Sequence, residues 1–157
     1  MFSEEAKKTL DQIVAKYPNK KAALLPALWL AQEEYGGWLP AEAMAEVAGY
    51  LELSAAEVEG VATFYTMYNK EPIGKFHIEV CHNIACMVVG ADELIDHIAA
   101  KLKIRKGETT PDRKFTLNGA ECLGACANAP CMMIHDKYYE NVTPAKADQI
   151  LEELSKK

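Results

Sequence analysis

Residues 75–86 read KFHIEVCHNIAC, and this stretch decides the fold class of the second half of the chain. Apolar and polar side chains alternate from Phe76 to Val80, which is the pattern of a β-strand with one buried face. The strand reaches a thiol at Cys81, and a second thiol follows at Cys86. We therefore expect a half-buried strand that leads into a loop carrying two cysteines.

A second pair of cysteines follows another predicted strand. Phe115 to Leu117 reads as a short strand, and Cys122 and Cys126 come after it in the sequence CLGAC. Glycine and alanine surround this pair, so that backbone amides can approach the sulfur atoms closely. Each pair of cysteines therefore follows a predicted strand and lies in a loop.

All five cysteines of the chain lie between Cys81 and Cys131, and their number is odd. The N-terminal sequence MFSEEAKKTLDQ is charged and amphipathic, unlike a secretory signal or a transit peptide. We therefore expect a cytoplasmic protein with reduced thiols. Clustered thiols in such a chain indicate metal binding rather than a disulfide framework.

Four of the thiols suit a [2Fe–2S] cluster, which needs two thiolates on each iron and backbone N–H groups near the sulfurs. These candidate ligands are Cys81, Cys86, Cys122 and Cys126. A structural zinc site, which also uses two thiol pairs, remains an alternative. The absence of a Cys-x-x-Cys motif disfavours thioredoxin-type dithiol chemistry, and the spacing of the second pair differs from that of plant-type ferredoxins.

Histidine offers a different ligand set, because a Rieske centre uses two cysteines and two histidines. His82 lies inside the first cysteine loop, but no histidine accompanies the second pair. We expect His82 to face solvent, and we expect His77 and His97 at surface positions on a strand and a helix. The histidines are therefore not predicted as ligands.

Cys131 is the fifth thiol and begins the apolar run CMMI. A buried cysteine in such a run behaves as a small hydrophobic residue, so we expect a packing role. A spare or alternate ligand is the second interpretation. If packing is the role, replacing Cys131 by alanine leaves the spectrum of the cluster unchanged.

The first seventy residues have a helical pattern. Apolar residues recur at helical spacing in four segments that short turns separate. The segments are 4–17, 20–35, 41–51 and 54–68. Ser54 and Glu57 form the capping box that opens the last segment. We expect a small helical bundle in this part of the chain.

The sequence EPIG at residues 71–74 is the expected junction between two domains. We place a helical domain at residues 1–72 and a second domain at residues 73–157. The second domain has further helices predicted at 90–102 and 145–154 and further strands predicted at 131–135 and 138–142. The order β-α-β-β-α predicts an α+β fold in which helices pack on a small sheet.

Composition argues against several classes of partner. The chain has a formal net charge of -6 and a sequence pI of about 5.3, which disfavours binding to nucleic acid. No apolar run approaches the roughly 20 residues of a membrane-spanning helix, so direct membrane insertion is not expected. Neither a catalytic acid–base pair nor a phosphate-binding glycine loop is visible in the sequence.

Three motifs together resemble one protein family. They are GWLP at residues 37–40, VEGVATFY at residues 58–65, and the cysteine pattern that ends in CLGAC and is followed by Pro130. The family is that of the E-type (24-kDa-type) component of NADH–quinone oxidoreductase, respiratory complex I. The resemblance covers both halves of the chain.

The resemblance implies a thioredoxin-like [2Fe–2S] domain in which Cys81, Cys86, Cys122 and Cys126 hold one cluster. It implies an electron-transfer subunit of an NADH-oxidising enzyme, without a complete active site of its own. The cluster would exchange single electrons with FMN on a partner flavoprotein, the F-type subunit, which also binds NADH. Through that partner the chain would join the rest of complex I, in the cytoplasm and peripheral to the inner membrane.

The same resemblance leaves the parent enzyme open. Equivalent subunits occur in NAD-linked hydrogenases and formate dehydrogenases, and a free-standing thioredoxin-like ferredoxin is a further alternative. The helical domain is the expected docking domain. Its candidate interface residues are Phe64, Tyr65, Met67 and Tyr68, with packing inside the domain as the alternative. Members of the family usually have methionine or valine after the proline, where this chain has Cys131.

Overall fold

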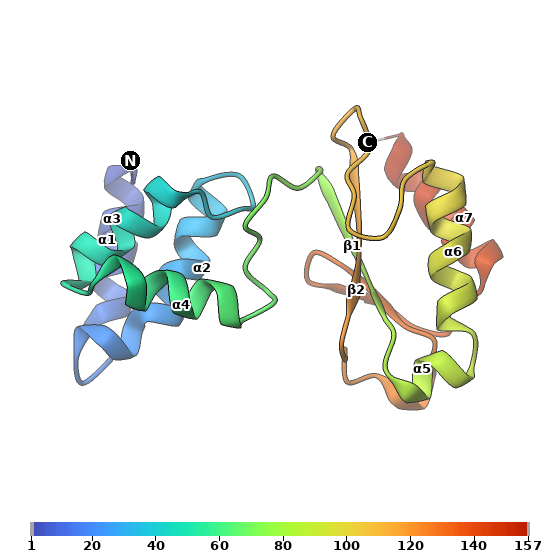
Figure 1. Cartoon of the computed structure of the whole chain (residues 1–157), viewed down its shortest axis with the longest axis horizontal. Helices are drawn as coiled ribbons and strands as arrows, with labels where there is room; N and C mark the ends of the chain where they lie inside the picture. Colours follow the sequence, from blue (N-terminus) through green and yellow to red (C-terminus); the bar gives the residue numbers. More distant parts are fainter. Residues whose placement is uncertain (1, 157) are drawn as a thin grey trace. The chain divides into compact units, whose positions relative to one another are not determined.

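The chain folds into two units, one helical and one built on a β-sheet, and the computed structural model describes residues 2–156. The helical unit ends at Pro72, and the sheet unit begins at Ile73 (Figure 1). Each unit has a buried hydrophobic core of its own, which is the basic requirement for an independently folding domain.

Four α-helices form the helical unit. They are α1 (Glu4–Val14), α2 (Leu24–Glu34), α3 (Ala41–Leu51) and α4 (Ala55–Phe64), and a short 3-10 helix (Lys20–Ala23) precedes α2. The fully buried residues of their common core include Leu10, Leu28, Val47 and Val58, one from each helix. The predicted capping box opens α4 at Ser54. The predicted helical character of this half is therefore confirmed.

The fourth helix is shorter than predicted, because it ends at Phe64 and not at Tyr68. Tyr65 has extended backbone angles, with φ of -91° and ψ of 119°. The Tyr68 side chain is 1% exposed, and its hydroxyl donates to the carbonyl of Leu25 at 2.8 Å. Tyr68 is therefore a core residue and not an interface candidate, whereas Phe64, Tyr65 and Met67 are exposed.

A four-stranded sheet and the helices that pack on it form the second unit. Its elements are β1 (Phe76–Cys81), α5 (Ile84–Val88), α6 (Ala91–Leu102), β2 (Phe115–Ala120), a short 3-10 helix (Cys126–Asn128), β3 (Met132–Ile134), β4 (Lys137–Tyr139) and α7 (Pro144–Ser155). The strands lie in the order β2-β1-β3-β4, with β2 parallel to β1 and the other two pairs antiparallel. Figure 1 shows α6 and α7 on the same side of the sheet. Ile98 of α6 and Leu151 of α7 share the core with Ile78 of β1, so the predicted α+β fold is confirmed.

The strand β1 is buried on both faces, although the sequence predicts a half-buried strand. Of its six residues only Glu79 is not fully buried. On its second face, His77 contacts Asn118 of β2, and Cys81 belongs to a small buried cluster with Cys86 and Cys131. His77 is 9% exposed, and its Nε2 accepts a hydrogen bond from the Asn118 side chain at 2.8 Å. The predicted surface position of His77 is therefore wrong.

The burial of His77 makes stability depend on pH. Burial, followed by the nearby His135, lowers the pKa of His77 from 6.5 to about 4. Below pH 6.5 the imidazole of His77 binds a proton more readily in the unfolded chain than in the folded chain. The free energy of unfolding is therefore highest, as far as His77 is concerned, above pH 6.5, and it decreases as the pH falls toward 4. The loss is at most about 3 kcal/mol.

Urea unfolding of the wild type and of His77→Gln, at about pH 7 and about pH 4.5, measures this effect. The variant has no imidazole to protonate, so its free energy of unfolding should change less between the two pH values. An equal change in both proteins would contradict the role of His77.

The α-helices of the chain are short. The longest within residues 2–156 are α6 and α7, with 12 residues each. A helix needs about 20 apolar residues to cross a bilayer. Within the described residues, no helix is long and apolar enough to do so.

Candidate metal centre

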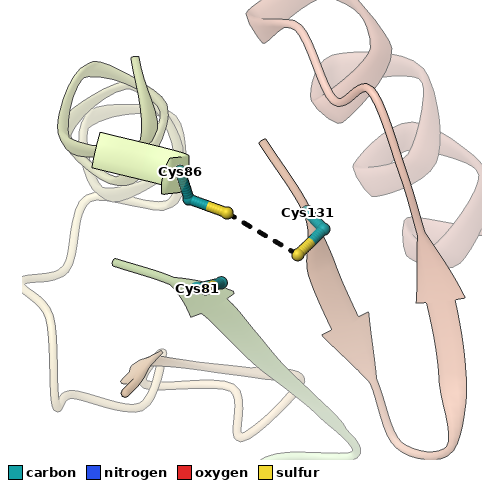
Figure 2. Close-up of side chains that lie close together, drawn as sticks. All are labelled: Cys81, Cys86 and Cys131. Carbon is teal, nitrogen blue, oxygen red and sulfur yellow. Dashed lines mark hydrogen bonds between the residues drawn. The ribbon is translucent and has the colours of Figure 1, made fainter. Parts of the chain in front are cut away.

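Three buried thiols meet at one end of the sheet (Figure 2). Cys81 is the last residue of β1, Cys86 lies in α5, and Cys131 directly precedes β3. Their Sγ atoms all lie within 4.8 Å of one another, and those of Cys86 and Cys131 are 3.8 Å apart. These three residues, the three-thiol group, are placed so that they could hold a metal ion.

Local structure explains why these thiols meet. The backbone N–H of Cys81 donates to the carbonyl of Cys131 at 3.1 Å, which extends the pairing of β1 with β3. Asn83 caps α5 by accepting a hydrogen bond from the N–H of Ile84, and the helix that follows carries Cys86. The sequence predicts a loop here and not α5, because five residues are too few for a helical period. The capping potential of Asn83 is the only local signal for this helix.

The other two predicted ligands lie in an exposed loop. Cys122 and Cys126 follow β2, and both are exposed. The backbone N–H of Gly124 donates to Cys122 Sγ at 3.4 Å, and Gly124 has a φ of 75°, which glycine adopts without strain. The structure therefore brings Cys81 and Cys86 together, adds Cys131 to them, and leaves Cys122 and Cys126 outside the three-thiol group.

Contacts join the two cysteine loops. Leu123, the residue after Cys122, packs against the buried cluster that contains Cys81, Cys86 and Cys131. The side-chain amide of Asn83 donates to the carbonyl of Glu121 at 2.8 Å. The loop with the exposed thiols therefore begins directly beside the buried ones. Thiols in two adjacent loops, with backbone N–H groups directed at sulfur, fit a [2Fe–2S] cluster.

Burial and hydrogen bonds act in opposite directions on the buried thiols. Burial raises the pKa of Cys81, but the backbone N–H groups of Asn83 and Leu123, together with the neighbouring thiols of Cys86 and Cys131, outweigh it, so that this pKa lies below the ordinary value of 9.0. Burial raises the pKa of Cys131 to about 12, and the neighbouring Cys86 adds to the rise. Of these two thiols, Cys81 is the better prepared to bind a metal as thiolate.

His82 lies beside the centre, but its ring packs against the sheet. The side chain is 28% exposed, so the expected solvent-facing position is only partly correct. The ring occupies the space that a side chain at Gly119 in β2 would need. Among the described residues, the group that could hold a metal contains cysteines alone. The geometry therefore gives no support to a Rieske ligand set.

Gly119→Ala should destabilise the chain by about 1–3 kcal/mol, because overpacking forces neighbouring groups to move. The new Cβ would lie 2.6 Å from His82 Cδ2 and 3.0 Å from its Nε2. The same substitution in a His82→Ala background should cost much less, because the ring is gone. Urea unfolding of the four proteins measures the two costs. Equal costs in both backgrounds would show that the ring is not the obstacle.

Comparison with known proteins identifies the family. Residues 10–155 match the family model of the thioredoxin-like [2Fe-2S] ferredoxins. The chain is 46% identical to an E-type subunit of NADH-quinone oxidoreductase, the second form in Rhizobium meliloti (strain 1021), over 91% of this chain and 84% of the relative. It is 44% identical to the E-type subunit of the same enzyme from Rickettsia bellii (strain RML369-C), over 98% of this chain and 93% of the relative. The resemblance inferred from three motifs is therefore confirmed.

A solved structure with the same fold is that of an NAD+-reducing [NiFe]-hydrogenase in the H2-reduced state, with a TM-score of 0.75. The identity is 24%, and the match covers 85% of this chain and 23% of the hydrogenase chain, so the likeness concerns the fold alone. The family model, in contrast, spans nearly the whole chain. This chain therefore belongs to the thioredoxin-like [2Fe-2S] ferredoxin family and is a homologue of the E-type subunits of NADH-quinone oxidoreductase.

Proposed function

We propose that this chain carries one [2Fe–2S] cluster and acts as an electron-transfer subunit of an NADH-oxidising complex, as a counterpart of the E-type subunits of NADH–quinone oxidoreductase. The observation that carries the proposal is the contact between the two cysteine loops, through Asn83 with Glu121 and through Leu123 with the buried thiols, in a chain 46% identical to such a subunit. A zinc site would use the same thiols, but the family match favours iron and sulfide.

The proposed ligands are Cys81, Cys86, Cys122 and Cys126. When bound, a cluster of this kind takes up or releases one electron at a time. The chain itself provides a protected and polar setting for the sulfurs. Burial keeps water from Cys81 and Cys86, and the N–H groups of Asn83 and Leu123 favour negative charge on Cys81.

The proposed partner is a flavoprotein subunit that holds FMN and NADH, because hydride carries two electrons and a flavin can pass them on singly. Exposed apolar side chains beside the thiols support a covered surface here. They form the α5 apolar patch, which consists of Ile84, Met87, Val88 and Val89, with Ile84 70% and Val88 76% exposed. An exposed apolar patch of this kind is typical of a surface that a partner covers.

Through this partner the chain would be a peripheral subunit of complex I on the cytoplasmic side of the inner membrane. The equivalent subunit of an NAD-linked hydrogenase is the second candidate, because the hydrogenase structure shares the fold. The identity of 46% to the Rhizobium relative, against 24% to the hydrogenase chain, favours complex I.

Co-expression of the chain with the F-type flavoprotein subunit, followed by purification of the complex, tests this function. The purified complex should contain iron and acid-labile sulfide, and NADH should reduce the cluster under anaerobic conditions, as seen by EPR. The chain alone should be reduced by dithionite and not by NADH. A colourless protein with bound zinc would refute the cluster. A cluster that dithionite reduces but NADH never reduces in the complex would refute the proposed partner.

A further inference from the structure

We propose that Cys131 is a reserve ligand of the metal centre, whose thiol can take the place of Cys86 on the same metal. The inference rests on the proposed function, because it concerns the site that would hold the cluster. It takes up the second interpretation of Cys131 from the sequence, a spare or alternate ligand, in place of the packing role.

The distance between the two sulfurs suits a shared metal. Two thiolates bound to one tetrahedral metal at about 2.3 Å lie about 3.8 Å apart. The Sγ atoms of Cys86 and Cys131 are 3.8 Å apart. Figure 2 shows the two side chains pointing toward each other from α5 and from the start of β3. The thiol of Cys131 is thus close enough to reach a metal that Cys86 would otherwise hold.

The position of Cys131 does not depend on the side chain of Cys86. The carbonyl of Cys131 accepts a hydrogen bond from the N–H of Cys81 at 3.1 Å, and the carbonyl of the preceding Pro130 accepts one from Val142 at 2.9 Å. These backbone hydrogen bonds involve no atom of the Cys86 side chain. The thiol of Cys131 should therefore stay in place when Cys86 is replaced.

Cys131 is packed among the other buried thiols and not in the main hydrophobic core of the sheet unit. Cys131 is 0% exposed and belongs to a small buried cluster made of Cys81, Cys86, Ala91 and itself. The next residue, Met132, belongs to the main core of the sheet unit instead. Successive side chains of an extended segment point to opposite faces, which explains how one apolar run serves both clusters.

Three variants of the full-length chain test the reserve role. Cys131→Ala alone should keep the iron content and the EPR spectrum of the wild type. Cys86→Ala should keep about half of the wild-type iron, with altered g-values, because Cys131 supplies the fourth thiolate. The double variant Cys86→Ala/Cys131→Ala should keep at most about a tenth of the iron, because the cluster then lacks a ligand.

Cys126→Ala, with and without Cys131→Ala, is the matched control, because Cys126 lies outside the three-thiol group. The single variant Cys126→Ala and the double variant Cys126→Ala/Cys131→Ala should lose iron to the same extent. Circular dichroism checks the fold, and Cys86→Val, which fills the space of the thiol, replaces Cys86→Ala if that variant does not fold.

Two outcomes would overturn the reserve role while the proposed function stands. In the first, the wild type holds a cluster, but the Cys86 variant loses as much iron as the double variant. In the second, the Cys86 variant keeps its iron whether or not Cys131 is present. A wild-type chain without iron and sulfide would instead overturn the proposed function, and the reserve role with it.

Discussion

Cys122→Ala and Cys126→Ala should each give a folded chain that retains at most about a tenth of the wild-type iron. Both side chains are exposed, so their removal leaves the hydrophobic cores unchanged. If they hold one edge of the cluster, each substitution leaves one iron with only one of its two thiolates. The expected result is therefore loss of the cluster without loss of the fold.

Iron and sulfide analysis of the purified variants measures the loss of the cluster. Circular dichroism with thermal unfolding of the cluster-free proteins shows whether the fold is kept. Ala127→Ser, in the same exposed loop, is a control that keeps every thiol and should keep the cluster. Full iron content in Cys122→Ala and in Cys126→Ala would move the site to the three-thiol group. The ligand set proposed from the sequence would then be wrong.

Val88→Glu should weaken binding to the flavoprotein subunit by about 100-fold or more, which corresponds to about 2.7 kcal/mol. Val88 is 76% exposed and lies in the α5 apolar patch, only two residues from Cys86. If a partner covers this apolar surface, a carboxylate within it would be buried without a partner, which is costly. The chain itself should fold normally, because Val88 is not part of either main core.

Affinity measurement between the purified chain and the flavoprotein subunit tests this expectation. Tyr138→Glu is the matched control, because Tyr138 is also an exposed apolar residue of the sheet unit, at 48%, but lies in β4. Its affinity should stay close to that of the wild type. If Val88→Glu binds as tightly as the wild type, the α5 apolar patch is not the docking surface. If both variants bind equally weakly, the effect is one of added charge and not of position.

The ends of the helices show which features of the fold can be predicted from neighbouring residues. The predicted segment 41–51 coincides with α3, because Pro40 marks its start and an apolar stripe runs to Leu51. The predicted end of α4 is wrong, because the chain leaves the helix at Tyr65 so that Tyr68 can reach the backbone of α2. That contact joins residues 43 positions apart, and no local pattern reports it.

The candidate site shows the same division. The spacing of the cysteines predicts two thiol loops, and the structure brings the loops together through Leu123 and Asn83. Sequence spacing treats Cys131 as a leftover thiol in an apolar run. In the folded chain its sulfur lies 3.8 Å from the sulfur of Cys86. The two residues are 45 positions apart in the sequence, so no local pattern indicates this contact.

By itself, the sequence determined that the chain has a helical half and a half with strands, and it determined the types of the main elements and the presence of thiol loops after strands. These features depend on periodicity, capping and spacing, which act over a few neighbouring residues. Only the tertiary structure decided that β1 is buried on both faces, that His77 lies inside, and that Cys131 joins Cys81 and Cys86. The physical reason is strand pairing: β3 aligns beside β1 through backbone hydrogen bonds, and this register sets which distant side chains share a face.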